Sequence, residues 1–234
     1  MLLAAALLAA PAGGGGLFPL PPLPPPGRYG NLLLDRVSTK NGVKPVGFSH
    51  WSHRLKYACR VCHSELEFGM TRGETEISEA ANREGRFCGA CHDGSVAFGR
   101  TEGSCPKCHS GSLDSGKEGL AQLKRLPKAK FGNQVDWVAA LAGGLIRPAI
   151  SLSADYRAMV FDKSLSLEAE WSIIPPAVFP HAAHLAWLDC ESCHPGVFNI
   201  QKKTTKHFSM GLILERQFCG ACHLNVAFPL EVAG

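Results

Sequence analysis

Hydrophobic and polar positions follow no long regular period along most of this chain. The clearest exception is a stretch with helical spacing, formed by Val135, Val138, Ala139 and Ala142. Asn133 could cap this helix, and Gly143-Gly144 followed by Pro148 would end it. The pattern predicts one short amphipathic helix at about residues 133–142. Elsewhere it predicts a mainly α fold of short helices and extensive irregular loops, with little or no β-sheet.

The N-terminal segment is apolar and then rich in glycine and proline. The run from Leu2 to Ala10 is wholly apolar, and Ala10-Pro11-Ala12 has the A-x-A form of a signal-peptidase site, although no Lys or Arg precedes the run. We expect a cleaved signal peptide at residues 1–12, followed by a Gly/Pro-rich leader at residues 13–42 that serves as a tether or strap. The apolar run is too short to span a bilayer, so we predict no transmembrane helix.

An internal repeat with an offset of 131 residues organises the body of the chain. The string Phe87-Cys88-Gly89-Ala90-Cys91-His92 recurs as Phe218-Cys219-Gly220-Ala221-Cys222-His223, and an F-x-H-x-x-H string precedes the first Cys-x-x-Cys of each copy. The sequence ends about where a third motif of the second copy would begin. We therefore interpret the chain as a duplication with a shortened second copy, joined by a linker at residues 112–176 that contains no Cys or His.

All ten cysteines belong to five C-x-x-C-H strings, which is the attachment signal for c-type haem. Two cysteines three positions apart lie on one face of a helical turn, where both can bond the vinyl groups of one haem. The adjoining histidine then provides a ligand to the iron. The strings are Cys59-Cys62-His63, Cys88-Cys91-His92, Cys105-Cys108-His109, Cys190-Cys193-His194 and Cys219-Cys222-His223. The sequence predicts five covalently bound haem c groups.

Three other uses of paired cysteines fit less well. Structural zinc sites also use C-x-x-C pairs, but they do not require a histidine after every second cysteine, and five pairs would leave one pair unmatched. A disulfide framework would not fix the histidines either. A thioredoxin-like dithiol needs a βαβ context that the hydrophobic pattern does not provide.

The histidine count matches a second iron ligand for each haem. Five of the ten histidines lie in the motifs, and the other five are His50, His53, His181, His184 and His207. The first four form the repeated H-x-x-H pairs. His207 has no counterpart in the first copy.

The string F-S-H-W-S-H at residues 48–53, followed by three C-x-x-C-H motifs, resembles the small class III multihaem cytochromes, particularly the three-haem type. The resemblance covers about residues 43–111 and 174–228. It implies a three-haem domain at residues 43–111 and a two-haem domain at residues 177–234, both organised around stacked haems. It also implies that His50 and His53 ligate the haems of Cys59/Cys62 and Cys88/Cys91, and that His181 and His184 ligate those of Cys190/Cys193 and Cys219/Cys222.

The third haem, at Cys105/Cys108, lacks the distal histidine that the resemblance leads one to expect. Segment 83–86, just before the second motif, contains no histidine. We hypothesise that His207 reaches across from the second copy to complete this haem. Met70 is the next candidate, because His/Met ligation is common in c-type cytochromes, and Met210 is a third; core packing is the simpler interpretation of each methionine.

These features predict electron transfer as the function, with the iron centres six-coordinate and no catalytic residues. Covalent haem attachment takes place outside the cytoplasm, so we expect a periplasmic or extracellular protein that carries electrons in anaerobic respiration. Expected partners are other redox proteins, such as cytochromes or a quinol-linked donor. Two alternatives stay open: a small reductase with an open haem at Cys105/Cys108, or a haem-bearing subunit of an outer-membrane conduit, a filament or a homo-oligomer.

The formal net charge is +4, but the sequence contains no basic run or stripe, so nucleic acid is not an expected partner. Haem propionates would make the finished protein more acidic than this figure. Lys56, Arg60 and Arg72 lie near the motifs and could steer acidic partners, although ordinary solvated charges are an equally good interpretation.

Overall fold

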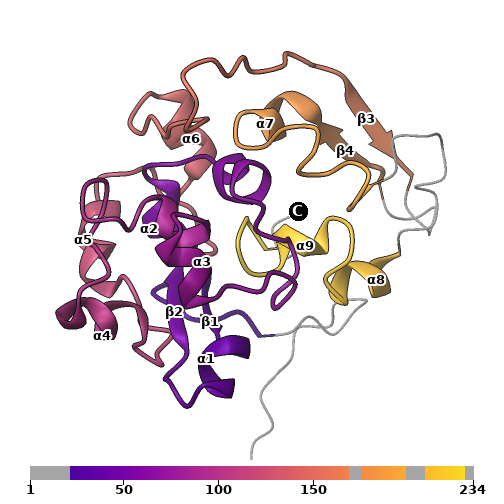
Figure 1. Ribbon diagram of the computed structural model, residues 1–234. Coiled ribbons are helices and arrows are strands. Elements are labelled where there is room, and N and C mark those ends of the chain that lie inside the picture. The colour runs from indigo at the N-terminus through magenta and orange to yellow at the C-terminus, as the bar shows by residue number, and fades with distance from the viewer. Residues whose placement is uncertain (1–21, 169–174, 199–208, 230–234) are drawn as a thin grey trace, which may run out of the picture.

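A computed structural model describes residues 22–168, 175–198 and 209–229, and the predicted signal peptide and His207 lie outside these ranges. Short helices and turns joined by long loops make up most of the described chain (Figure 1). Helices this short are not stable alone and depend on tertiary contacts. The α-helices are α1 (Arg36–Lys40), α2 (His50–Arg54), α3 (Glu79–Arg83), α4 (Cys105–Cys108), α5 (Leu120–Leu123), α6 (Trp137–Ala142), α7 (His181–Leu185), α8 (Met210–Leu214) and α9 (Gly220–His223).

The described residues form two small two-stranded antiparallel sheets. Strand β1 (Asn31–Leu34) pairs with β2 (Val46–Ser49), and β3 (Ser164–Leu167) pairs with β4 (Ala177–Pro180). In each repeat the second strand leads directly into the helix that carries the H-x-x-H pair, β2 into α2 and β4 into α7. The predicted mainly helical fold with little sheet is confirmed, and the strands hold the two histidine helices at equivalent places.

The predicted leader is partly structured. Strand β1 and helix α1 both fall within residues 13–42. Tyr29 is 3% exposed, and its hydroxyl donates to the Ala227 carbonyl of the second repeat. From about residue 25 onward the chain therefore behaves as a strap laid over the protein rather than as a free tether. No helix in the described ranges is long and apolar enough to cross a membrane.

The linker provides most of the main hydrophobic cluster of the described residues. Trp51 and Ala58 of the first repeat and Trp187 of the second pack into one cluster with linker side chains. The linker members are Leu123, Leu126, Val135, Trp137, Ala140 and Ile146. A segment without chemistry of its own thus joins the two repeats through buried apolar surface, the dominant favourable contribution to folding.

Helix α6 differs in detail from the predicted helix at 133–142. It begins at Trp137, and Asp136 is its N-cap, accepting a hydrogen bond from the Ala139 amide at 2.9 Å. Asn133, the predicted cap, instead accepts from the indole Nε1 of Trp137 at 3.1 Å. Of the predicted apolar positions, Val135 is buried at 3% exposure but precedes the helix, whereas Val138 is 59% exposed; within the helix the buried side chains are Trp137 and Ala140. The large indole of Trp137 therefore decides which face of the helix is buried, more than the number of small apolar side chains does.

Candidate functional site

The C-x-x-C-H strings form tight helical turns. In four of them the amide of the histidine donates to the carbonyl of the first cysteine, as at His194 to Cys190, 2.8 Å. The same bond is 2.9 Å in the second, third and fifth strings. The first string lies on a π-helical turn, Val61–Glu65. Such turns place both thiols on one side of the backbone, and all ten cysteines are unpaired.

Several of the cysteine thiols are buried in the protein without haem. Burial raises the pKa of Cys62 and Cys222 to about 12, and that of Cys88 and Cys193 to about 11. A redox-active dithiol requires the opposite, a lowered pKa that favours the thiolate. These surroundings suit thiols that bond once to a large apolar group.

Every described histidine makes the same kind of hydrogen bond through its Nδ1 atom. In all nine, Nδ1 lies within hydrogen-bond distance of a backbone carbonyl oxygen, which assigns the proton to Nδ1 and leaves Nε2 with a free lone pair. The carbonyls are Gly30 for His50 (2.9 Å), Ser49 for His53 (2.9 Å), Phe68 for His63 (2.8 Å), Phe98 for His92 (3.2 Å), Lys44 for His109 (2.7 Å), Lys163 for His181 (2.7 Å), Pro180 for His184 (2.9 Å), Phe198 for His194 (2.6 Å) and Phe228 for His223 (3.3 Å).

A phenylalanine carbonyl orients four of the five motif histidines. Phe68, Phe98, Phe198 and Phe228 follow their histidines by four to six residues. The repeat of Phe98 as Phe228 is visible in the sequence, but its role is not, because a backbone carbonyl and not the side chain makes the contact. The orienting carbonyl of His109 comes from Lys44, far earlier in the chain.

Three histidine pairs face each other at a common distance. Two imidazoles bound through Nε2 to opposite faces of one metal, at about 2.0 Å each, have ring centres roughly 6 Å apart. The ring centres of His50 and His63 are 6.4 Å apart, with an angle of 7° between the ring planes. The other two pairs are His53 with His92 at 6.3 Å and His184 with His223 at 6.2 Å.

These paired imidazoles are suited to bind a metal in their neutral form. Burial is the largest influence on His50 and lowers its pKa to about 4. Burial also lowers the pKa of His53, His63 and His223. A neutral imidazole keeps the lone pair that a metal requires. Each pair would supply the two axial ligands of a haem iron.

Among the described residues, the fourth and third sites lack a facing pair of histidine rings. In the described part of the chain, no ring contact joins His181 to His194; the His181 ring packs against Phe161 and Phe179, both at 4.9 Å. The Sδ of Met159 lies 3.6 Å from the Sγ of Cys190, so the linker borders the fourth site.

At the third site, no histidine ring among the described residues is in contact with the ring of His109. His207 lies outside the described ranges, as said above. Met70 lies in the loop before α3, and Met210 is the first residue of α8. The choice among these three candidates stays a prediction.

Thiols of different motifs influence one another's pKa. Neighbouring motifs are identified by the charge interactions between their thiols, which add to the effect of burial on the cysteine pKa values. These interactions link Cys108 to Cys88, Cys88 and Cys91 to Cys62, Cys59 to Cys222, and Cys219 to Cys193. These interactions join the second motif to the third and to the first, the first motif to the fifth across the two repeats, and the fifth to the fourth.

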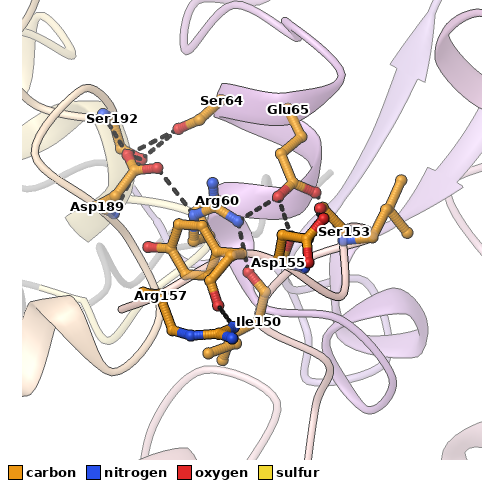
Figure 2. A network of polar contacts seen from close by, with 12 residues as sticks. Arg60, Ser64, Glu65, Ile150, Ser153, Asp155, Arg157, Asp189 and Ser192 are labelled. Atoms are coloured by element: carbon orange, nitrogen blue, oxygen red, sulfur yellow. Dashed lines mark hydrogen bonds and ion pairs between the residues drawn. The ribbon is translucent and has the colours of Figure 1, made fainter. Parts of the chain in front are cut away.

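A buried ion-pair network fastens the first motif to the fourth (Figure 2). Arg60, inside the first C-x-x-C, donates to Asp189 at 2.8 Å and to Glu65 at 2.5 Å. Ser64 donates to the other oxygen of Asp189 at 2.8 Å and lies 2.9 Å from Ser192. Asp189 immediately precedes Cys190 of the fourth motif, and Ser192 lies between the two cysteines of that motif. The network therefore fixes two predicted attachment sites relative to each other.

The suggestion that Arg60 steers partners is wrong, because this residue is 7% exposed and bound on both sides by carboxylates. The guanidinium also lies 3.7 Å from the centre of the Tyr156 ring. Arg72 is half exposed and pairs with Asp35. The sequence does not distinguish these roles, since the burial of Arg60 depends on segments about 90 and 130 residues away.

The residues fit haem c rather than a bare metal ion. Within the described ranges, no three His, Cys, Asp or Glu side chains gather into a metal-ion site. Pairs of opposed imidazoles beside paired buried thiols instead suit a cofactor that brings four equatorial nitrogens of its own. Haem c is the cofactor that bonds such thiols. The fold and site define a multihaem c-type cytochrome.

The chain belongs to the family described as cytochrome c7 and related cytochrome c, which it matches over residues 46–110 and 177–228, half of its length. Electron transfer by haem c is the general function of this family. No curated protein matches the chain.

Three solved structures are similar to the chain. The C-terminal hexahaem fragment of GSU1996 is 25% identical, with 88% of this chain and 92% of that chain covered and a TM-score of 0.29. The N-terminal hexahaem fragment is 24% identical, covering 88% and 94%, and the dodecahaem cytochrome c GSU1996 is 23% identical, covering 82% and 69%; both also have a TM-score of 0.29.

Proposed function

We propose that this protein carries five covalently bound haem c groups and transfers electrons between redox partners in the periplasm or at the cell exterior, in anaerobic respiration. The observation that carries the proposal is the common orientation of nine histidines, each with Nδ1 at a backbone carbonyl and Nε2 free. Single histidines in cores or on surfaces have no reason to share this arrangement. Three of the pairs also have the spacing of axial ligands.

Each part of the chain has a distinct task in this proposal. The ten cysteines anchor the cofactors, and His63, His92, His109, His194 and His223 are the proximal ligands. His50, His53, His181, His184 and His207 are the distal ligands. Haem c supplies reversible one-electron chemistry at iron when it is bound. Two histidine ligands on an iron leave no open position for a substrate, which favours electron transfer over catalysis.

Location and partners follow from the same chemistry. Haem is attached to C-x-x-C-H strings outside the cytoplasm, so the mature protein acts there. Its partners are other cytochromes or a quinol-linked donor, met through small transient interfaces. Ligand identity and hydrogen bonding to the histidines set the haem potentials.

Intact mass combined with a pyridine haemochrome assay tests the proposal. We expect a mass above that of the polypeptide by five haems and a haemochrome count of five per chain, with all five reduced and reoxidised reversibly. A polypeptide without added mass and without a Soret band would overturn it. If fewer than five haems are bound, mapping the adducts on peptides would identify the C-x-x-C-H strings that carry none.

Replacing His207 with alanine tests the ligand of the third haem. If His207 crosses between repeats, His207→Ala should convert one of five haems from low-spin to high-spin and open it to carbon monoxide. His50→Ala is the matched control, because the His50–His63 spacing predicts the same change at one haem. Absorption and magnetic circular dichroism spectra report the spin state. Five low-spin haems in His207→Ala, with one lost in His50→Ala, would rule out the cross-repeat ligand and favour Met70.

A further inference from the structure

Just before β3, the linker contacts both sides of the fourth proposed haem site. The Sδ atom of Met159 lies 3.6 Å from the Sγ atom of Cys190, an anchor of that site. The ring of Phe161 meets the imidazole of His181 edge to face, with ring centres 4.9 Å apart. The carbonyl oxygen of Lys163 accepts from Nδ1 of His181 at 2.7 Å. One short segment therefore lies against the proposed anchor and against the proposed distal ligand.

The hydrogen bonds of His181 repeat those of His50 in the first copy. The backbone amide and Nδ1 of His50 both bond the Gly30 carbonyl, at 3.0 and 2.9 Å. The same two atoms of His181 both bond the Lys163 carbonyl, at 3.2 and 2.7 Å. Gly30 directly precedes β1, and Lys163 directly precedes β3. Because His50 faces His63 with nearly parallel rings, the same pair of bonds favours the orientation of an axial ligand for His181.

Phe161 is an addition to the second copy. In both copies the phenylalanine of the F-x-H-x-x-H string packs edge to face on the first histidine, Phe48 on His50 at 4.8 Å and Phe179 on His181 at 4.9 Å. Among the described residues, this is the one phenylalanine that the His50 ring contacts, whereas Phe161 makes a second contact with His181. Aromatic pairs of this geometry stabilise beyond the area that they bury. The linker thus adds to the hold on His181.

Contacts with the first motif fix the linker shortly before this segment. The Arg60 guanidinium donates to the Ile150 carbonyl at 2.6 Å, as Figure 2 shows, and lies 3.7 Å from the ring centre of Tyr156. The amide of Leu152 donates to a carboxylate oxygen of Glu65 at 2.8 Å. The segment therefore extends to the fourth site from a fixed origin, which allows it to hold a side chain there in one place.

We propose that Met159, Phe161 and Lys163 are positioning residues of the fourth haem site. Lys163 and Phe161 hold His181 as the distal ligand of the iron, and Met159 packs on the cofactor beside Cys190. The inference rests on the proposed function, and it gives the linker a part in cofactor binding. A thioether is an adaptable apolar group that suits such packing. A distal imidazole held in this way leaves the iron less often, because its movement must break an aromatic contact.

Phe161→Ala tests the contact through the rate at which the iron opens. We expect carbon monoxide to bind one of the five reduced haems about two to ten times faster, the factor to which one aromatic pair corresponds. Phe161→Tyr keeps the ring and should retain the wild-type rate. Val160→Ala, at the exposed neighbouring residue, is the matched control and should change nothing. Stopped-flow mixing measures the rates, and EPR of the oxidised proteins reports the orientation of the axial imidazoles.

His181→Ala identifies the haem that responds. This variant should leave one haem high-spin, and Phe161→Ala should change the EPR signal of that same haem. Unchanged rates and EPR signals in Phe161→Ala, with five haems bound, would overturn the inference and leave the proposed function intact. Met159→Leu should keep all five haems low-spin. One high-spin haem in Met159→Leu, with none in His181→Ala, would assign ligation to the methionine and also overturn the inference. A wild-type chain without haem would overturn both proposals.

Discussion

Replacing Cys59 and Cys62 together with alanine should remove one haem and destabilise the whole chain far more than the same double replacement at Cys105 and Cys108. The first motif lies within the core, with Val61 1% exposed, whereas Cys105 is exposed. An unfilled cofactor cavity at the first motif should cost at least about 3 kcal/mol, by analogy with large core truncations. Thermal denaturation of the four-haem proteins, checked by intact mass, measures the difference.

The same pair of variants compares a motif at the junction between the repeats with one inside the first repeat. Loss of the first haem removes the site at the junction between the repeats, where Arg60 and Ser64 bond Asp189, whereas the third motif neighbours the second motif of the same repeat. Reduction by a donor should therefore become biphasic in the Cys59→Ala/Cys62→Ala protein and stay monophasic in the control. Equal stability and equal kinetics of the two variants would contradict the central position of the first motif.

Arg60→Met should lower the free energy of unfolding by about 3 kcal/mol, because it leaves two buried carboxylates without their cation. The side chains of Glu65 and Asp189 are 20% and 16% exposed, and both keep other donors, which limits the loss. Arg28→Met is the matched control. The Arg28–Asp114 pair is exposed on both sides, and such pairs contribute little. Denaturant titration of the haem-loaded proteins reports both, and equal midpoints for the two variants would show that the network adds no stability.

The pH dependence of stability provides a second measurement on the network. Burial alone would raise the pKa of Asp189, but hydrogen bonds from Ser192, Arg60 and Ser64 outweigh it and lower the pKa. Because the folded value lies below the unfolded value of about 3.9, this stabilisation is complete above that pH and is lost as the pH falls through the folded value. Asp189→Asn should remove this acid-dependent loss. An unchanged acid limb in Asp189→Asn would contradict it.

Local chemistry was accessible from the sequence because its parts are close together in the chain. A C-x-x-C-H string contains the proposed anchors and one proposed iron ligand within five residues, so the attachment sites can be predicted without knowledge of the fold. The repeated H-x-x-H pairs follow in the same way, and the structure places His50, His53 and His184 opposite the motif histidines that the family resemblance assigns to them. The carbonyls that orient the histidines could not be predicted from the sequence, because any residue type can provide a backbone oxygen.

The sequence by itself determined the class of cofactor, the repeat and the mainly helical, loop-rich character of this protein. Only the tertiary structure decided that the linker joins both repeats in one hydrophobic cluster and that Arg60 is buried between two motifs. The physical reason is the range of the interactions. Covalent anchoring acts over a few residues, whereas the packing of Trp51, Trp137 and Trp187 joins segments that lie far apart in sequence and is fixed only when the whole chain buries its apolar surface.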